Sequence, residues 1–149
     1  MLIYLYAEGE MNIVIVGLDY KMVRSIANEL AKVMQYKFID LTKRFDRELI
    51  ENINYPIGLS DDELTEKERE LIYLASKKAN VVISIPDNMY LSNEGYKFFK
   101  NSISIAIKLR KVDDIREKIQ NFLSDRVKFV LDEENCEIDK ILDLIKERV

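Results

Sequence analysis

Hydrophobic residues along this chain alternate between short continuous runs and longer stretches with helical spacing. The short runs are rich in β-branched and aromatic residues and predict buried strands. They cover residues 12–16, 36–41, 80–85, 102–109 and 127–131. The stretches between them have the spacing of amphipathic helices. We expect helices at residues 23–33, 45–52, 60–78, 92–100, 112–122 and 138–149, of which the third begins with a Ser60–Glu63 capping box.

The repeated order of strand and helix indicates an α/β fold. We expect a single domain over residues 1–149, with helices covering both faces of a parallel sheet in three layers. Ligands of such sheets bind beyond the carboxyl ends of the strands, so the chemistry should lie in the segments that follow each strand. Residues 1–10 precede the first clear strand and have two open interpretations: an extra edge strand, or an extension from a start codon upstream of Met11.

Charge and composition argue against several classes of function. The net charge is −4, whereas a nucleic acid or an anionic membrane would need a basic face. The chain has no histidine, which removes Ser-His-Asp catalysis and His-ligated metals. A lone cysteine, Cys136, fits a reducing compartment. No apolar run approaches the ~18 residues of a membrane span. We expect a cytoplasmic protein with no nucleic-acid or membrane partner.

The segment after the first strand partly matches a phosphate-binding loop, G-x-x-x-x-G-K-[ST]. In that motif the glycines let backbone N–H groups wrap the phosphates, the Lys reaches the terminal phosphates, and the Ser/Thr holds Mg²⁺. Residues 17–25 read GLDYKMVRS, so the strand and the first glycine fit while the lysine position does not. By itself this match carries no functional conclusion.

The sequence around that loop resembles the shikimate kinase family. The family reads V-x-I-G-x-x-G-x-G-K-[ST]-T, then L-A, then G-Y-x-F-x-D-x-D, and this chain has MNIVIVGL, IANELA and YKFIDL at the same spacing. Residues 79–91 and 132–149 resemble the family's Gly-rich segment and its last helix. The resemblance covers residues 11–149. It implies a P-loop kinase fold with five strands in the order 2-3-1-4-5, and transfer of the ATP γ-phosphate to shikimate in aromatic amino-acid biosynthesis. Another nucleoside- or nucleotide-kinase relative of the same fold is the competing resemblance.

The departures from the family pattern fall on its phosphate-binding residues. Aligned without a gap on G-L-x-G-x-G-K-[ST]-T, the chain agrees at Gly17, Leu18 and Ser25. Tyr20 and Met22 replace glycines, Val23 replaces the lysine, and Arg24 replaces the Mg²⁺ ligand. The degenerate loop therefore comprises Gly17, Asp19, Tyr20, Lys21, Met22, Val23, Arg24 and Ser25.

The metal and substrate side of the family site is altered as well. The family's metal-side aspartate falls on Asp40 and its glutamate on Glu68, but its second aspartate falls on Thr42 and its arginine on Thr65. Its Gly-Gly-Gly stretch becomes Pro86, Asp87 and Asn88. Residues 112–125 have room for one helix and a turn, so we expect the Arg-bearing lid to be deleted. The vestigial metal and substrate side comprises Asp40, Thr42, Glu68, Pro86, Asp87 and Asn88.

These losses favour a pseudokinase with no catalytic residues, no metal and no cofactor, because each missing charge-stabilising donor costs roughly 10²–10³ in rate. Its partner would be an unknown protein or a small anion. Two alternatives stay open. A divergent shikimate kinase would need ATP and magnesium, and a third type of domain would bind a nucleotide or anion without turnover.

Two cations of the degenerate loop have candidate roles. Arg24 is predicted to form a salt bridge with Asp40 where the related kinases hold Mg²⁺, because an arginine suits a partly buried carboxylate. Lys21 and Arg24, near a helix N-terminus, could also hold a free anion. Asp19, Asp40 and Asp87 all follow strands, but they lack the ligand spacing of a metal site.

Overall fold

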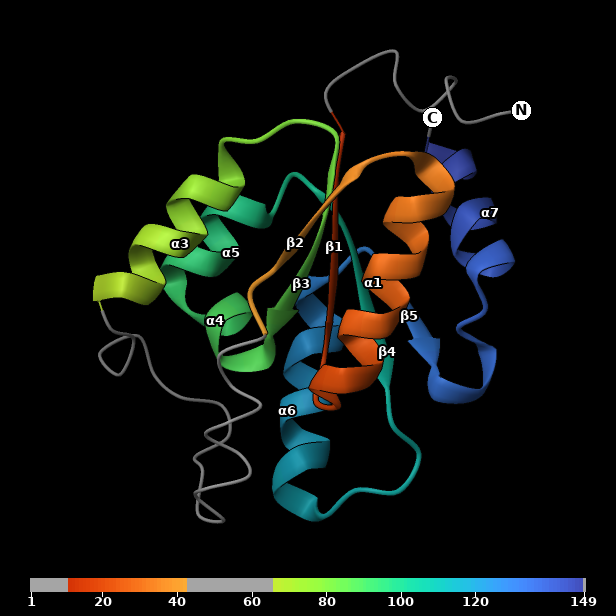
Figure 1. The fold of residues 1–149 in the computed structure, drawn as a ribbon. Helices are drawn as coiled ribbons and strands as arrows, with labels where there is room; N and C mark the ends of the chain where they lie inside the picture. Colours follow the sequence, from red (N-terminus) through yellow and green to blue (C-terminus); the bar gives the residue numbers. More distant parts are fainter. Residues whose placement is uncertain (1–10, 43–65, 149) are drawn as a thin grey trace.

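The computed structural model describes residues 11–42 and 66–148, and their fold is a five-stranded parallel sheet between two layers of helices (Figure 1). The strands lie in the order β2-β3-β1-β4-β5, which confirms the predicted topology. Their bounds are Asn12–Gly17 for β1, Lys37–Asp40 for β2, Val81–Pro86 for β3, Ile103–Lys108 for β4 and Phe129–Asp132 for β5. All four neighbouring pairs are parallel.

The two faces of the sheet are covered by different helices. Helices α1 (Tyr20–Met34) and α7 (Ile138–Arg148) pack on Ile13 and Ile15 of β1. The opposite face, with Val14 and Val16, carries α3 (Glu66–Ser76), α4 (Asp87–Leu91), α5 (Asn93–Phe99) and α6 (Asp114–Arg126). Since alternate side chains of a strand point to opposite faces, the continuous apolar run of β1 supplies both cores.

The segment between β4 and β5 holds α6 and short connections only. Residues 109–113 lead from β4 into α6, and residues 127–128 lead from α6 into β5. Asp113 caps α6 by accepting a hydrogen bond from the backbone N–H of Arg116 at 2.9 Å. Every residue of this span belongs to the sheet, the helix or these links, so the prediction of one helix without a lid is confirmed. A short 3-10 turn, Glu133–Asn135, joins β5 to α7.

Several element boundaries differ from those predicted. Helix α1 begins at Tyr20 rather than residue 23, because Asp19 provides its cap. Strand β3 ends at Pro86 as predicted, although the proline is its last residue, pairing with Gly17, rather than the first residue after it. The helix expected at 92–100 is confirmed as α5, whereas the short helix α4 before it was not predicted. The segment 1–10 with its two interpretations, the helix expected at 45–52, the Ser60–Glu63 box and Thr65 lie outside the described residues.

Candidate functional site

The connection between β1 and α1 consists of Leu18 and Asp19 alone. Tyr20, Lys21 and Met22, which align with the phosphate-wrapping part of the loop, form the first turn of α1. The Oδ1 atom of Asp19 accepts a hydrogen bond from the Met22 backbone N–H at 3.1 Å. A carboxylate of the chain therefore occupies the helix N-terminus, the place where phosphate groups are usually held in this type of fold.

Tyr20 fills the space between the start of α1 and the start of α4. Its hydroxyl donates a hydrogen bond of 2.5 Å to Oδ1 of Asp87, the first residue after β3. Tyr20 is 4% exposed and Asp87 1% exposed, so the pair is buried. Since β1 and β3 are neighbours, this bond links the two segments that follow the carboxyl ends of these central strands.

Arg24 and Asp40 form the predicted salt bridge. The guanidinium Nε lies 2.8 Å from Oδ2 of Asp40, and the two side chains are 26% and 14% exposed. The Nε–H bond is not aligned as a hydrogen bond, so the contact is an ion pair. The Nη2 atom donates to the Thr42 hydroxyl at 3.3 Å. The prediction that these two side chains meet across the gap between β1 and β2 is confirmed.

The other oxygen of Asp40 is used by neighbouring hydroxyl and amide groups. Oδ1 accepts hydrogen bonds from the Thr42 backbone N–H at 2.8 Å, the Thr42 hydroxyl at 2.6 Å and the Ser84 hydroxyl at 2.8 Å. Ser84 belongs to β3, which lies between β1 and β2, and it is the residue of β3 that pairs with Asp40 across the sheet. Sequence reasoning missed Ser84, although its place in an apolar strand was a usable signal, because a buried hydroxyl needs a partner.

The remaining predicted residues are structural or solvent-facing. Gly17 is held tightly, since an added Cβ would lie 2.9 Å from the Ile107 carbonyl oxygen. Val23, in the lysine position, is fully buried. Lys21 and Ser25 are exposed. Glu68 is buried in α3, and Asn88 is 1% exposed with no hydrogen-bond partner for its amide among the described residues. Residues 11–42 and 66–148 contain no group of three or more acidic or cysteine ligands suited to a metal.

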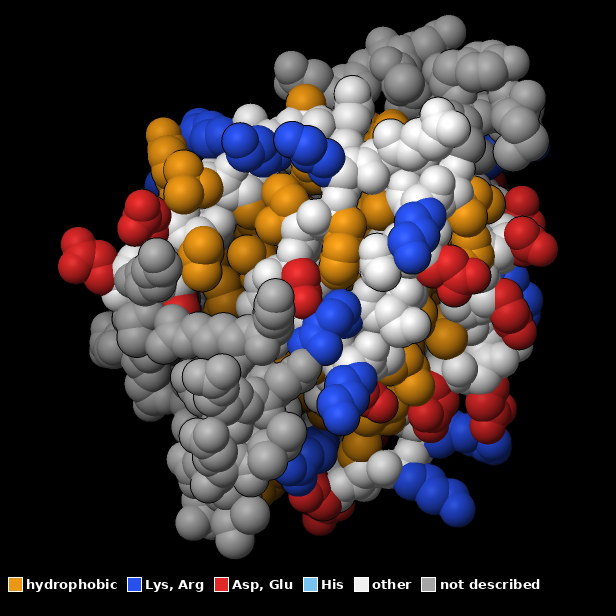
Figure 2. All heavy atoms as spheres, in the orientation of Figure 1, with side chains coloured by type: hydrophobic (Ala, Val, Ile, Leu, Met, Phe, Trp, Pro, Cys, Tyr) orange, Lys and Arg blue, Asp and Glu red, His pale blue; other side chains and the backbone are white. Residues whose placement is uncertain are grey.

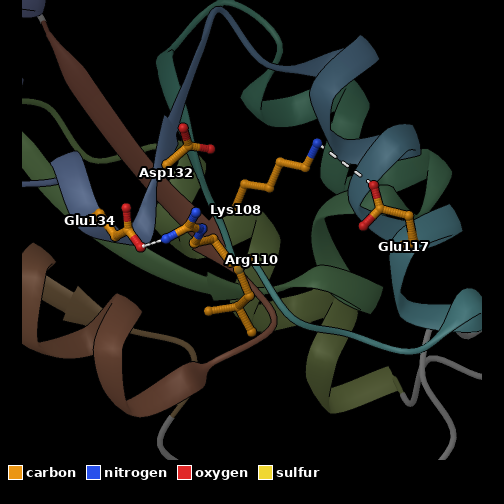
Figure 3. A pocket seen from close by; sticks show the side chains of 6 residues that line it. Lys108, Arg110, Glu117, Asp132 and Glu134 are labelled. Carbon is orange, nitrogen blue, oxygen red and sulfur yellow. Dashed lines mark hydrogen bonds and ion pairs between the residues drawn. The ribbon is translucent and has the colours of Figure 1, made fainter.

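A cavity of about 350 Å³, away from the Arg24–Asp40 pair, opens at the carboxyl ends of β4 and β5 (Figure 3). Charged side chains line it, and they pair within the chain: Lys108 with Glu117 at 3.7 Å, and Arg110 with Glu134. Gln120 fixes the backbone of Leu109, which lines the cavity: its Oε1 accepts from the Leu109 N–H at 2.7 Å, and its Nε2 donates to the Leu109 carbonyl oxygen at 3.1 Å. Charges of both signs compensate one another here, so the cavity gives no net attraction for an anion.

Outside the site, the pKa values of Tyr90 and Cys136 depart from their ordinary values. Burial raises the pKa of Tyr90, whose hydroxyl donates to the Arg126 carbonyl oxygen at 2.8 Å. Burial also raises the pKa of Cys136, which keeps its thiol protonated and unreactive. No described helix is long and apolar enough to cross a membrane.

Comparisons with known proteins find similarity in fold to solved structures. No family model and no curated protein matches the chain. Shikimate kinase from Acinetobacter baumannii in complex with shikimate is 16% identical, over 95% of this chain and 96% of its own, with a TM-score of 0.63. The enzyme from Aquifex aeolicus is 18% identical, over 93% and 98%, with a TM-score of 0.64. The chain has a shikimate-kinase-like P-loop fold.

A second kinase supports the same architecture. A gluconokinase from Sinorhizobium meliloti is 14% identical, covers 91% of this chain and 89% of its own, and gives a TM-score of 0.53. These identities are low, so the likeness extends to the fold of small-molecule P-loop kinases and not to their activity. The differences at the site therefore have to be judged on their own chemistry.

Proposed function

We propose that this chain is a shikimate-kinase-like pseudokinase that acts by binding or regulating a partner rather than by transferring phosphate. The observation that carries the proposal is the filled phosphate position. Asp19 caps α1 with its own carboxylate, and Tyr20 is buried against Asp87 where a glycine loop would wrap a phosphate. A bound phosphate would have to displace both groups and would meet the negative charge of Asp19.

The electrostatics of the site support the same proposal. Phosphoryl transfer depends on positioning and on cations that stabilise the transferred group, and each lost donor costs roughly 10²–10³ in rate. Val23 replaces the lysine and is fully buried, so it supplies no charge. Arg24 supplies a charge in the Mg²⁺ position, but that charge is paired with Asp40. With a single cysteine, the chain suits a reducing compartment, and we propose that it acts in the cytoplasm.

One alternative is a divergent shikimate kinase that uses ATP and magnesium. The fold likeness favours it, because shikimate kinases match over nearly the whole of both chains. The other alternative is a nucleotide- or anion-binding domain without turnover. Exposed Lys21, in the first turn of α1, is the observation in its favour. The three candidates differ in what they bind and in whether ADP is produced.

A coupled assay for ADP release tests the proposal directly. The full chain is incubated with ATP, Mg²⁺ and shikimate, beside an active shikimate kinase as positive control. We expect no shikimate-dependent turnover above the enzyme-free background. Turnover in the ordinary kinase range, ~1–100 per second, would reject the pseudokinase and establish the divergent kinase.

Calorimetry with ATP–Mg²⁺ and with inorganic phosphate separates the first and third candidates. The pseudokinase proposal expects no heat of binding from either ligand. If the chain is a non-catalytic binding domain, the titration should give a measurable heat of binding. Lys21→Ala should then weaken the binding, because Lys21 is an exposed cation in the first turn of α1. A variant with Lys32→Ala, at the other end of the same helix, is the matched control.

A further inference from the structure

The last turns of α3 and α5 form a surface near the amino ends of the strands. The candidate site lies at the other end of the sheet. These helices lead into the amino ends of β3 and β4, whereas the site lies at the carboxyl ends (Figure 1). Tyr73 of α3 packs edge to face on Phe98 of α5, with ring centroids 5.8 Å apart. Tyr73 is 47% exposed and Leu74 49% exposed. We define Tyr73, Leu74, Lys77, Lys97 and Phe98 as the α3–α5 surface.

The charged side chains of this surface are both lysines; the acidic residues one turn away are the exposed Glu70 of α3 and Glu94 of α5, which pairs with Arg69. The Nζ atom of Lys77 lies 5.1 Å from the Tyr73 ring centroid, and that of Lys97 lies 5.8 Å from the Phe98 centroid. Lys78 and Lys100 follow nearby, and residues 71–80 and 95–102 contain no Asp or Glu. Within the described part of the chain, none of these four lysines forms an ion pair. Figure 2 shows basic side chains beside hydrophobic ones at the upper left, over the end of α3.

Helix stability explains only part of this arrangement. Lysines in the last turn of a helix interact favourably with the helix dipole. That preference gives no reason for two large apolar side chains, Tyr73 and Leu74, to stand half exposed beside the lysines. Exposed aromatic residues that cluster with apolar neighbours are the usual anchors of protein interfaces. Cations around such an anchor select a partner of opposite charge.

We propose that the α3–α5 surface docks an acidic segment of another protein that also carries an apolar side chain. The apolar side chain packs on Tyr73 and Leu74, and flanking carboxylates pair with Lys77 and Lys97. The net charge of −4 and the occupation of the ring faces by lysine ammonium groups disfavour a nucleic acid, which would need open rings for base stacking. The surface is separate from the candidate site, so the proposal does not depend on the loss of kinase activity.

The test is a titration of the full chain, labelled with nitrogen-15 and followed by NMR, with a synthetic glutamate–tyrosine copolymer. Polyglutamate, oligothymidylate and phosphatidylserine-containing vesicles are the comparison probes. We expect the copolymer to bind more tightly than the other three and to shift the amide resonances of Tyr73, Leu74 and Lys97. Shifts confined to other regions, or tighter binding of polyglutamate, would overturn the proposal. Tighter binding of oligothymidylate or vesicles would replace it with a nucleic-acid or membrane surface.

Variants then assign the binding to these residues. Tyr73→Ser and the pair Lys77→Glu with Lys97→Glu should each lower the affinity for the copolymer about tenfold or more, as expected for interface anchors. Lys32→Glu is the matched control, since Lys32 also lies in the last turn of a helix but on the other face of the sheet, and it should leave the affinity unchanged. If Tyr73→Ser impairs folding, Leu74→Ser takes its place. Unchanged affinity in the folded variants would disprove the assignment.

Discussion

At the scale of single residues, three carboxylates of the candidate site, Asp19, Asp40 and Asp87, accept hydrogen bonds from groups of the chain, while the buried amide of Asn88 has no hydrogen-bond partner among the described residues. Asp40 accepts three hydrogen bonds on Oδ1 and holds Arg24 on Oδ2, so its bonding capacity is used within the chain. Asp87 accepts a hydrogen bond from the Tyr20 hydroxyl, and Asp19 accepts one from the Met22 backbone N–H. Buried carboxylates require such partners, and a metal or a phosphate would have to displace them.

The Arg24–Asp40 pair is expected to be energetically coupled. In a cycle of Arg24→Ala, Asp40→Ala and the double variant, we predict a coupling energy of about 1 kcal/mol or more, above the range of fully exposed pairs. Asp40→Ala should cost more than Arg24→Ala, because it also leaves the hydroxyls of Thr42 and Ser84 without their acceptor. Urea unfolding of the four proteins measures this, and purely additive losses would contradict an ion pair in solution.

Tyr20→Phe removes one hydroxyl and keeps the ring. We predict a loss of about 1.5–3 kcal/mol in the free energy of unfolding, the usual range for a hydrogen bond to a charged group, because Asp87 loses a buried donor. Tyr73→Phe is the control, since that side chain is 47% exposed, and its effect should stay within about 0.5 kcal/mol. Equal effects of the two substitutions in urea unfolding would show that the Tyr20 bond contributes nothing.

Sequence reasoning found one of these two contacts and not the other. Arg24 and Asp40 could be paired because both fall on metal-side positions of a family pattern, and because an arginine is long enough to cross β3. Tyr20 and Asp87 are separated by 67 positions, and no spacing rule connects them. The bond depends on the early start of α1, which turns the phenol toward β3, and that start was itself mispredicted.

At the scale of elements, the sequence predicted strands better than helix boundaries. A buried parallel strand is a continuous apolar run, and β1, β3 and β4 are such runs. Helix ends depend on single capping residues. Asp19 starts α1 three residues early, and Ser92 separates α4 from α5 by accepting a hydrogen bond from Gly95. A capping side chain is polar and can instead bond to other nearby backbone groups. The hydrophobic periodicity therefore does not reveal at which residue a helix begins.

The contact between α4 and α5 depends on Gly95. A Cβ at this position would lie 1.8 Å from the Met89 carbonyl oxygen, a backbone atom that cannot move without shifting α4. We predict that Gly95→Ala lowers the free energy of unfolding by about 3 kcal/mol or more, despite the better helix propensity of alanine. Lys97→Ala, on the exposed side of the same helix, should change it by less than about 0.5 kcal/mol. A stabilised Gly95→Ala protein in chemical denaturation would show that the two helices can separate freely.

At the scale of the whole molecule, the topology was predictable because two independent signals agreed. The strand–helix alternation restricts the chain to a parallel sheet, and the family resemblance selects the order 2-3-1-4-5 among the arrangements that right-handed crossovers allow. Whether the site is catalytically active was harder to predict from the sequence than the fold. A fold tolerates the exchange of its loop glycines for Tyr20 and Met22 as long as the new side chains are packed, so the same architecture is compatible with an active or an inactive site.

Thermal unfolding with ATP–Mg²⁺ tests the proposed loss of nucleotide binding in the intact molecule. A ligand present at 100 times its dissociation constant adds about 2.7 kcal/mol to the stability of the folded state. For a chain of this size, each kcal/mol raises the Tm by about 2–4 °C, so such a ligand would raise it by about 5–10 °C. We predict a change of less than about 1 °C at millimolar ATP–Mg²⁺, with or without shikimate, because the pseudokinase proposal has Asp19 and Tyr20 filling the phosphate position through their hydrogen bonds to Met22 and Asp87.

An active shikimate kinase, heated in the same buffers, is the control that shows the ligands to be effective. A ligand that binds the folded chain and not the unfolded chain raises the Tm, whether or not catalysis follows. A rise of several degrees with ATP–Mg²⁺ would therefore mean that the loop opens. It would require the Tyr20–Asp87 bond to break at a cost smaller than the binding energy of the nucleotide. In that case Tyr20→Phe, which removes the bond in advance, should increase the shift further.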